Sequence, residues 1–146
     1  MKRILFIVTP DWYFMSHRLH LGISAIKSGF SVALLSKYSK HRDLIESKGI
    51  KVIDWELDRQ SKNPLKEIKS ILGLMSTINH YKPDIIYSVA MKSVLYSAII
   101  SQLKGIKSRV FTIAGLGFLF SSQSISAKLL RPFIKLAFKI LFGWGK

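Results

Sequence analysis

The segment Lys2-Arg3-Ile4-Leu5-Phe6-Ile7-Val8-Thr9-Pro10 decides the fold class of this chain. Its short run of β-branched and aromatic residues ends at a proline, which predicts a buried strand over residues 2–9. Continuous apolar strands of this length are typical of parallel sheets that are covered on both faces. The turn that follows, residues 9–18, contains no glycine and lacks the G-x-G-x-x-G pattern that binds dinucleotides in such sheets. We therefore expect a parallel α/β sheet that does not bind NAD or FAD at its first turn.

Beyond this strand, the chain alternates between strand and helix patterns. Residues 11–15 are predicted to form a loop, and Ser16 is predicted to cap a helix that ends at Gly29. Pro64 suits the first turn of another helix, which we expect to run to about Tyr81. The other strands are expected at 30–35, 50–54, 85–88 and 108–113, and the other helices at 40–48, 93–104 and 126–142. This order predicts an α/β fold with a doubly wound, Rossmann-like parallel sheet of about five strands.

A segment with two glycines follows the last predicted strand. Thr112-Ile113-Ala114-Gly115-Leu116-Gly117-Phe118-Leu119-Phe120 starts as a strand and breaks into a Gly-Leu-Gly turn. Gly115 and Gly117 let the backbone adopt positive φ or pass close to a ligand. Because open α/β sheets bind ligands beyond the carboxyl ends of their strands, we expect this turn to line a cleft. Only 26 residues follow Phe120, so we expect the other wall of the cleft to come from elsewhere.

The charge of the chain is strongly basic and unevenly distributed. The 146 residues include 23 Lys or Arg and 8 Asp or Glu, which give a net charge of +15. After Asp84 there are nine basic residues and no acidic residue. A C-terminal part whose charged residues are all basic favours an anionic partner, such as lipid headgroups, phosphates or nucleic acid. The alternative is a general excess of lysine of the kind that AT-rich genomes encode.

Four cationic side chains are candidates for contact with an anionic ligand. His17 and Arg18 lie just inside the first predicted helix, and a helix N-terminus presents free N–H groups that favour anions. Arg59 follows the third predicted strand, and Lys92 follows the fourth, where an ammonium group can bind a phosphate as a point charge. The alternatives are a solvated first turn for His17 and Arg18, a surface ion pair for Arg59 and an ordinary surface position for Lys92.

Several classes of site are not expected. Cysteine is absent, which excludes disulfides, thiolate metal sites and a cysteine nucleophile. The four histidines share no metal-ligand spacing, and neither a Walker A lysine motif nor a nucleophile elbow is present. We therefore expect no metal and no cofactor, and the catalytic residues are unassigned. The apolar run over residues 4–8 is too short for a signal peptide, and no run reaches the roughly 18 residues of a membrane span.

The last predicted helix combines a wide apolar face with a narrow cationic stripe. At 100° per residue, Lys128, Arg131, Lys135 and Lys139 fall within one arc, and Trp144 follows at the end. This pattern is typical of a helix that lies on an anionic membrane, and we expect these five residues to face it. The alternative is a helix packed on the core with its cations in water, because a doubly wound sheet needs helices on both faces.

The ordered motifs resemble a known family. They are His17-Arg18, Asp58-Arg59…Asn63-Pro64, Lys82-Pro83-Asp84, Lys92-Ser93 with Tyr96, and Thr112-Ile113…Gly115-Leu116-Gly117…Phe120. Over residues 3–140 the chain resembles the N-terminal, acceptor-side half of bacterial family 4 glycosyltransferases of GT-B architecture. The similar group uses lipid-linked sugars in surface polysaccharide or glycan assembly. Its members often carry KP-x-x-YG after the fourth strand, where this chain has Ser93 and Ser97 in place of the proline and the glycine.

This resemblance implies one Rossmann-like lobe of a GT-B fold and the transfer of a sugar from a nucleotide-sugar to a polyprenyl-diphosphate-linked acceptor. The reaction would take place at the inner face of the plasma membrane, to which the protein would bind peripherally. Acceptor-binding and cleft residues implied by the family are His17, Arg18, Arg59, Lys92, Gly115 and Gly117. The nucleotide-sugar would bind only with a second lobe, for which a separate donor-binding chain is one source.

Two hypotheses therefore stand at the level of sequence. In the first, residues 1–125 are a glycosyltransferase N-terminal domain and residues 126–146 its basic amphipathic helix, so that the chain ends before the donor-binding lobe. In the second, the chain is a non-enzymatic module whose basic surface binds anionic membranes or nucleic acid. We do not expect nucleic acid as a partner, because no recognised binding motif is present.

Overall fold

The structure is a computed structural model that describes residues 1–37, 39–113, 123–125, 128, 131, 132, 135, 136, 138 and 139. It divides into two units, Met1–Thr112 and Ile113–Lys146, which we describe separately. The turn with Gly115 and Gly117 lies outside the described residues, as does Trp144. The domain boundary expected at residues 125 and 126 stays a prediction.

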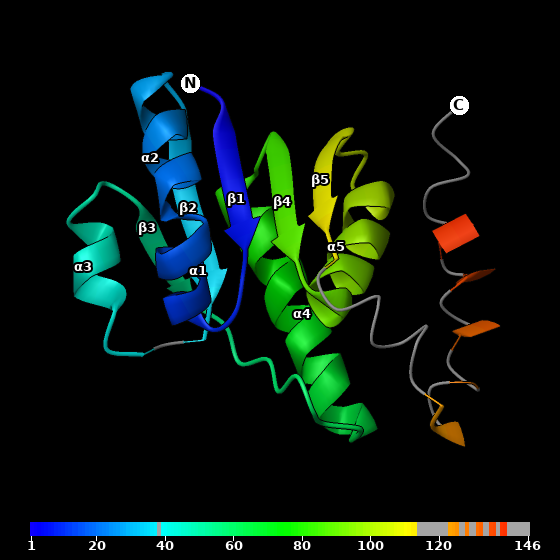
Figure 1. The fold of residues 1–146 in the computed structure, drawn as a ribbon. Helices are drawn as coiled ribbons and strands as arrows, with labels where there is room; N and C mark the ends of the chain where they lie inside the picture. The colour runs from blue at the N-terminus through cyan, green and yellow to red at the C-terminus, as the bar shows by residue number, and fades with distance from the viewer. Residues whose placement is uncertain are drawn as a thin grey trace. The chain divides into compact units, whose positions relative to one another are not determined.

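The first unit is built on a five-stranded sheet in which every strand is parallel to its neighbours (Figure 1). The strand order is β3-β2-β1-β4-β5. The strands are β1 (Arg3–Ile7), β2 (Ser31–Ser36), β3 (Lys51–Asp54), β4 (Ile85–Val89) and β5 (Ser108–Thr112). In the middle of the sheet, Phe6 of β1 lies opposite Leu34 of β2 on one side and Tyr87 of β4 on the other. The doubly wound, Rossmann-like parallel sheet expected from the sequence is thus confirmed.

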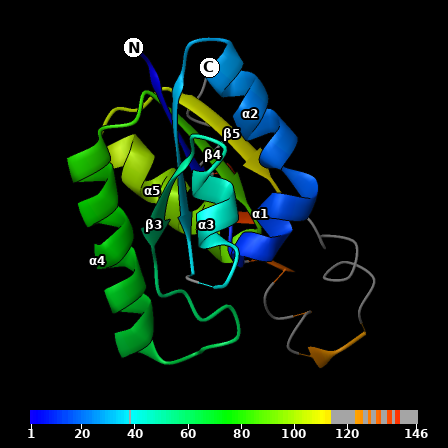
Figure 2. The same cartoon turned by 90° about the vertical axis from the view of Figure 1, so that its left-hand side faces the viewer.

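Helices cover both faces of this sheet (Figure 2). One face packs against α1 (Asp11–His17), α2 (Leu19–Lys27) and α3 (Arg42–Glu46), and the other packs against α4 (Pro64–Tyr81) and α5 (Met91–Leu103). Each face has its own buried cluster because successive strand side chains point to opposite sides. Phe6 and Leu34 join Phe14 of α1 in one cluster, whereas Leu5 and Leu35 belong to the other.

Local signals explain most of the helix boundaries. Helix α4 spans the predicted residues because Asn63 accepts a hydrogen bond from the backbone N–H of Leu65 at 3.0 Å and proline follows at the first helical position. Lys82, at φ 50°, ends the helix in the left-handed region. Asp84 then ties the next turn to β1, since the backbone N–H of Arg3 donates to Asp84 Oδ2 at 2.8 Å.

The loop predicted for residues 11–15 is wrong, because these residues form most of helix α1. Phe14 is fully buried and its ring lies 5.3 Å from the ring of Phe6 in an edge-to-face arrangement. This packing accounts for a helix in a segment that local propensity leaves undecided. Ser16 consequently lies inside α1 and does not cap a helix, and Arg18 separates α1 from α2.

In the second unit, the described residues from Ile125 to Lys139 have helical backbone, as the sequence predicts. Lys128, Lys135 and Lys139 are exposed, and Arg131 is half-buried. Within the described part of the chain, no helix is both long and apolar enough to cross a membrane.

Candidate functional site

The carboxyl ends of the strands form the edge at which parallel α/β sheets bind ligands. The segments after β1, β3 and β4 all emerge at this edge, which is the lower edge in Figure 1. They carry, in turn, Asp11, Arg59 and Lys92. The carboxyl edge therefore gathers charged side chains from distant parts of the sequence.

The segment after β3 is anchored on the core before it turns outward. Trp55 and Leu57 are both buried, and the indole N–H of Trp55 donates to the backbone carbonyl of Ser70 in α4 at 2.9 Å. The carboxylate of Asp58 then accepts hydrogen bonds from the backbone N–H groups of Gln60 and Ser61 at 3.0 and 3.2 Å. These bonds close a tight turn from Asp58 to Ser61.

The same bonds affect the ionisation of Asp58. Its pKa lies below the ordinary value of 3.8, chiefly because the N–H of Gln60 stabilises the carboxylate, with smaller contributions from Ser61, Lys66 and Lys92. Asp58 is therefore ionised at neutral pH and holds the turn closed.

Lys92, at the start of α5, binds the backbone of the Asp58–Ser61 turn. Its ammonium group donates to the backbone carbonyls of Asp58 at 2.9 Å and Ser61 at 2.7 Å. It also donates to Glu67 Oε1 at 2.7 Å. The hydroxyl of Tyr96, one helical turn beyond Lys92, donates to the other carboxylate oxygen of Glu67. The lysine and the tyrosine of the α5 motif therefore share one partner on α4.

Arg59 stands at the tip of the turn that Lys92 supports. Its side chain is exposed and, among the described residues, makes no hydrogen bond or ion pair. An exposed guanidinium group on a bonded turn can donate two parallel hydrogen bonds to a phosphate or a carboxylate. Of the cations predicted for the site, Arg59 and Lys92 are brought together.

His17 and Arg18 belong to the helices on the opposite face of the sheet. The exposed ring of His17 stacks on the ring of Tyr13, with a centroid distance of 4.4 Å. Arg18 is half-buried and donates from one guanidinium nitrogen to the backbone carbonyl of His17 at 3.0 Å. Because α1 starts at Asp11, His17 lies in its last turn rather than its first, where a cation is favourable for the helix without any ligand. The helix-start argument for an anion at this pair is therefore wrong, while its contact with a ligand stays a prediction.

Asp11 is a buried carboxylate that the sequence-based argument did not assign to the site. It is 1% exposed, and its Oδ1 accepts a hydrogen bond from the hydroxyl of Ser39 at 2.5 Å. The Nδ1 atom of His41 lies 3.0 Å from the same hydroxyl and 3.5 Å from Asp11 Oδ1. These contacts hold the segment after β2 against the start of α1. The signal for Asp11 in the sequence is its place directly after the first strand.

Two residues at or near the start of α5 are unusual: one has a strained backbone, and the other replaces the glycine of the family motif. Ala90 has φ 77° and ψ 156°, a conformation that costs a residue with a side chain about 1–3 kcal/mol. Ser97 occupies the position of the motif glycine, and its hydroxyl lies 2.7 Å from the hydroxyl of Ser88 on β4, with both side chains fully buried. The hydroxyl pair joins α5 to the sheet.

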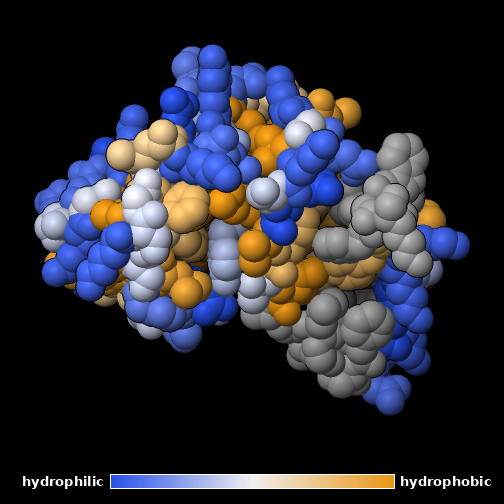
Figure 3. Space-filling view, turned by 90° about the horizontal axis from the view of Figure 1, so that it is seen from above, coloured by the Kyte–Doolittle hydropathy of each residue, from blue (hydrophilic) through white to orange (hydrophobic). Residues whose placement is uncertain are grey.

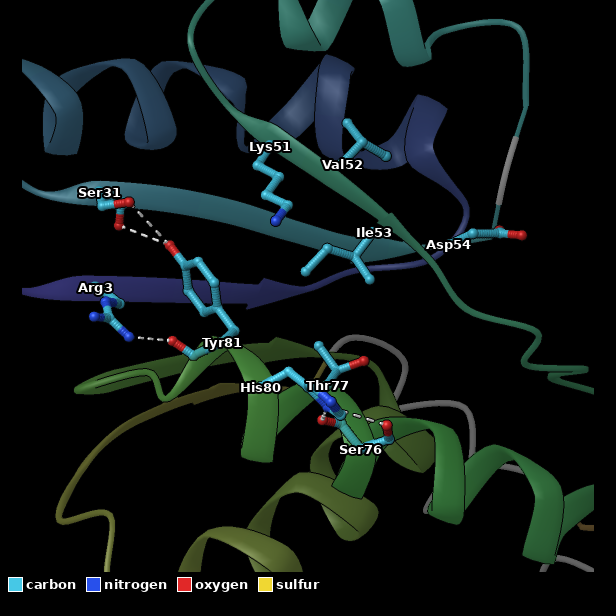
Figure 4. A pocket seen from close by; sticks show the side chains of 10 residues that line it. All are labelled: Arg3, Ser31, Lys51, Val52, Ile53, Asp54, Ser76, Thr77, His80 and Tyr81. Atoms are coloured by element: carbon cyan, nitrogen blue, oxygen red, sulfur yellow. Dashed lines mark hydrogen bonds between the residues drawn. The ribbon is translucent and has the colours of Figure 1, made fainter.

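Two hollows on the first unit are candidate ligand sites. The larger, about 570 Å³, lies between β3 and the end of α4 (Figure 4). There, the Tyr81 hydroxyl donates to the carbonyl of Ser31 at 3.2 Å, and Arg3 donates to the carbonyl of Tyr81 at 2.7 Å. Burial raises the pKa of Tyr81, which keeps its hydroxyl protonated as a donor. The hydroxyl of Tyr81 and the guanidinium group of Arg3 therefore already have partners within the protein, which makes this hollow the weaker candidate for a ligand site.

The smaller hollow, about 310 Å³, lies at the carboxyl edge. Its lining includes Lys37, Lys66 and Lys69 together with Glu56 and Asp58. Figure 3 looks onto the opposite side, at the amino ends of the strands, where hydrophilic side chains form much of the outline and apolar ones show between them. The carboxyl edge carries both this hollow and the Arg59 turn. It is also the edge at which parallel sheets bind their ligands. Among the described residues, no three His, Asp or Glu side chains cluster in a way that could hold a metal ion.

Comparisons with known proteins place this geometry in context. The model of a family described as glycosyl transferase 4-like matches residues 3–142. A curated relative from Campylobacter jejuni, the N,N'-diacetylbacillosaminyl-diphospho-undecaprenol alpha-1,3-N-acetylgalactosaminyltransferase, is 32% identical over 106 residues. The match covers 73% of this chain but only 27% of that relative, so the chain spans about a quarter of its length.

Solved structures of glycosyltransferases share the fold. MurG from Acinetobacter baumannii matches with a TM-score of 0.62 at 14% identity, over 77% of this chain and 35% of that chain. A glycosyltransferase from Rickettsia africae matches with a TM-score of 0.59 at 15% identity, over 94% of this chain and 39% of that chain. The likeness shows that the fold is that of one Rossmann-like lobe of a GT-B protein.

Proposed function

Since this chain belongs to the glycosyl transferase 4-like family, we propose that it forms the acceptor-side lobe of a glycosyltransferase. The complete enzyme transfers a sugar from a nucleotide-sugar to a polyprenyl-diphosphate-linked acceptor in surface-glycan assembly. The observation that carries this proposal is the match to the Campylobacter jejuni relative, whose name describes transfer of N-acetylgalactosamine to a diphospho-undecaprenol-linked sugar.

The charge of the carboxyl edge suits such an acceptor. A diphosphate presents several anionic oxygens, and the exposed guanidinium of Arg59 can bind two of them at once. Arg18 supplies further positive charge from the other face of the sheet, where the ring of His17 offers a hydrogen-bonding group, and Gly115 and Gly117 would let the backbone approach the ligand. We assign these five residues to the acceptor site.

A membrane-bound acceptor also requires the protein to reach the membrane surface. The net charge of +15 favours an anionic surface, and each cation held near such a surface contributes about 1 kcal/mol. We propose that Lys128, Arg131, Lys135, Lys139 and Trp144 face the cytoplasmic leaflet of the plasma membrane. The protein would then be bound peripherally to the membrane, and the lipid-linked acceptor would reach the carboxyl edge from the membrane.

The donor is bound together with a second lobe, on a longer chain or on a separate one. Transfer needs the charge that develops on the leaving diphosphate to be stabilised in a cleft closed to water. A single lobe provides one wall of such a cleft. One structural neighbour, the glycosyltransferase VinC, was crystallised in complex with DTDP, and this chain matches 34% of its length with a TM-score of 0.54.

Binding measurements on the 146-residue chain test the proposal. The probes are nanodiscs of neutral phosphatidylcholine that contain undecaprenyl diphosphate or, as a control, undecaprenol. We expect binding to the diphosphate discs alone, weakened at least tenfold by Arg59→Gln, since hydrogen bonds to charged groups are worth about 1.5–3 kcal/mol. Arg109→Gln makes the same charge change near the amino end of β5 and should leave the affinity unchanged.

Three results would overturn parts of the proposal. Equal binding to diphosphate and undecaprenol discs would remove the diphosphate as the recognised group. Binding to phosphatidylglycerol discs that is equally strong with and without undecaprenyl diphosphate, or strong binding to duplex DNA at physiological salt, would favour a non-enzymatic basic module. Transfer of a sugar from a nucleotide-sugar by the 146-residue chain without any partner would show that a second lobe is not needed.

A further inference from the structure

The ammonium group of Lys92 uses all of its hydrogen-bonding capacity within the protein. A lysine carries three N–H donors and no acceptor. The three donors meet the carbonyl of Asp58, the carbonyl of Ser61 and the carboxylate of Glu67, at 2.9, 2.7 and 2.7 Å. Its side chain is 25% exposed. A phosphate could bind Lys92 only by displacing one of these oxygens and would then lie close to the carboxylate of Glu67.

The three acceptors belong to two different segments, so that Lys92 ties both to α5. Two are main-chain carbonyls from the two ends of the Asp58–Ser61 turn, which the ammonium group therefore spans. The third, Glu67, lies in the first turn of α4 and also accepts a hydrogen bond from Tyr96. This cross-link fixes the turn relative to the carboxyl edge of the sheet.

Arg59 gains a defined position from these contacts without making any described bond itself. It lies between Asp58 and Ser61, whose carbonyls Lys92 holds. The carboxylate of Asp58 closes the same turn from its other side through the backbone N–H groups of Gln60 and Ser61. The backbone of the arginine is thus held at both ends, while its guanidinium group is left exposed.

We propose that Lys92 is a positioning residue that fixes the Asp58–Ser61 turn, so that Arg59 contacts the anionic group of the ligand and Lys92 does not. The identity of that ligand, a diphosphate, rests on the proposed function. The part of the inference that concerns the turn rests on the hydrogen bonds alone. Lys92→Met keeps much of the length of the side chain but removes the ammonium group, and is therefore the variant to test.

Hydrogen exchange tests the structural part without any ligand. In Lys92→Met, the amides of Gln60 and Ser61 should exchange about tenfold faster or more, since the bonds removed are charge-assisted. The matched control is Lys69→Met, which breaks only an exposed ion pair with Glu56 on the neighbouring surface, and should exchange like the wild type. If Lys92→Met does not fold, Tyr96→Phe removes one bond to Glu67 and should give a smaller increase. Unchanged exchange at Gln60 and Ser61 in folded variants would overturn the inference.

A double-mutant cycle tests the functional part. With undecaprenyl diphosphate discs as the probe, Lys92→Met should weaken binding about tenfold in the wild-type background and have no further effect in Arg59→Gln. It should also leave the salt dependence of binding unchanged, whereas Arg59→Gln should reduce it, because only Arg59 contacts the anion. Additive losses would show that Lys92 contacts the diphosphate directly. If the wild-type chain binds no diphosphate, the proposed function fails, and the exchange measurement still decides whether Lys92 fixes the turn.

Discussion

Replacing Glu67 with alanine should destabilise the fold by about 3 kcal/mol. Glu67 accepts charge-assisted hydrogen bonds from Lys92 and Tyr96, and such bonds contribute about 1.5–3 kcal/mol each. We take the lower end of that range because the side chains of Glu67 and Lys92 are 21% and 25% exposed, and because Lys92 keeps its two carbonyl acceptors. The higher helix propensity of alanine, worth a few tenths of a kcal/mol, offsets the loss of a first-turn acid.

Urea unfolding followed by far-UV circular dichroism measures this change. With a slope of about 2 kcal/mol per molar urea, the midpoint of Glu67→Ala should fall by about 1.5 M. Glu56→Ala is the matched control, because Glu56 also pairs with a lysine, Lys69, but both side chains are more than 70% exposed. That variant should leave the midpoint nearly unchanged. Equal midpoint shifts in the two variants would refute the argument that the Glu67 contacts hold α4, α5 and the turn together.

Three further outcomes are expected. Asn63→Ala removes the cap of α4 and should cost about 1 kcal/mol in the same urea assay; an unchanged midpoint would contradict the capping role. The pKa of Asp58 is lower in the folded chain than its ordinary value of 3.8, so its contribution to stability is present above that value and is lost as the pH falls through the lowered pKa. Stability measured from pH 6 down to pH 2 should therefore fall less steeply for Asp58→Asn than for the wild type, and parallel curves would argue against it. Ser97→Ala leaves the buried hydroxyl of Ser88 without its partner and should cost about 1 kcal/mol, whereas Ser88→Ala should cost less, because the Ser97 hydroxyl still donates to the carbonyl of Val94. The double variant should cost less than the sum of the two, and strict additivity would show that the hydroxyls do not interact.

The sequence allowed the sheet to be predicted because its signals are local. Strands β1, β2 and β4 are short runs of mostly apolar residues, and Pro64 with its cap at Asn63 marks the start of α4 directly. Helix α1 escaped prediction because its aromatic residues carry no helix signal of their own. Phe14 is placed by contact with Phe6 from the sheet, which is a tertiary interaction.

The site could be predicted only in part, for the same reason. The sequence indicated that Arg59 and Lys92 both lie at the carboxyl edge of the sheet, and the structure brings the turn that carries Arg59 into contact with Lys92. It could not indicate that the donors of Lys92 are already used, because their partners lie 25 to 34 residues away in the chain. A lysine after a strand has the same sequence signature whether it binds a ligand or supports a turn. The contacts of His17, Arg18, Gly115 and Gly117 with an acceptor stay predictions.

Strand β1 is the middle strand of the finished sheet, but its two neighbours are synthesised at different times. Strands β2 and β3 are complete by Asp54, whereas β4, which pairs with the other side of β1, ends at Val89. At about 5–20 residues per second, the ribosome needs about 2–7 seconds to make the residues in between. Throughout that interval, one row of backbone N–H and C=O groups on β1 has no partner strand and can pair with another polypeptide. Translation that pauses before Val89 would prolong the time for which this strand has only one partner.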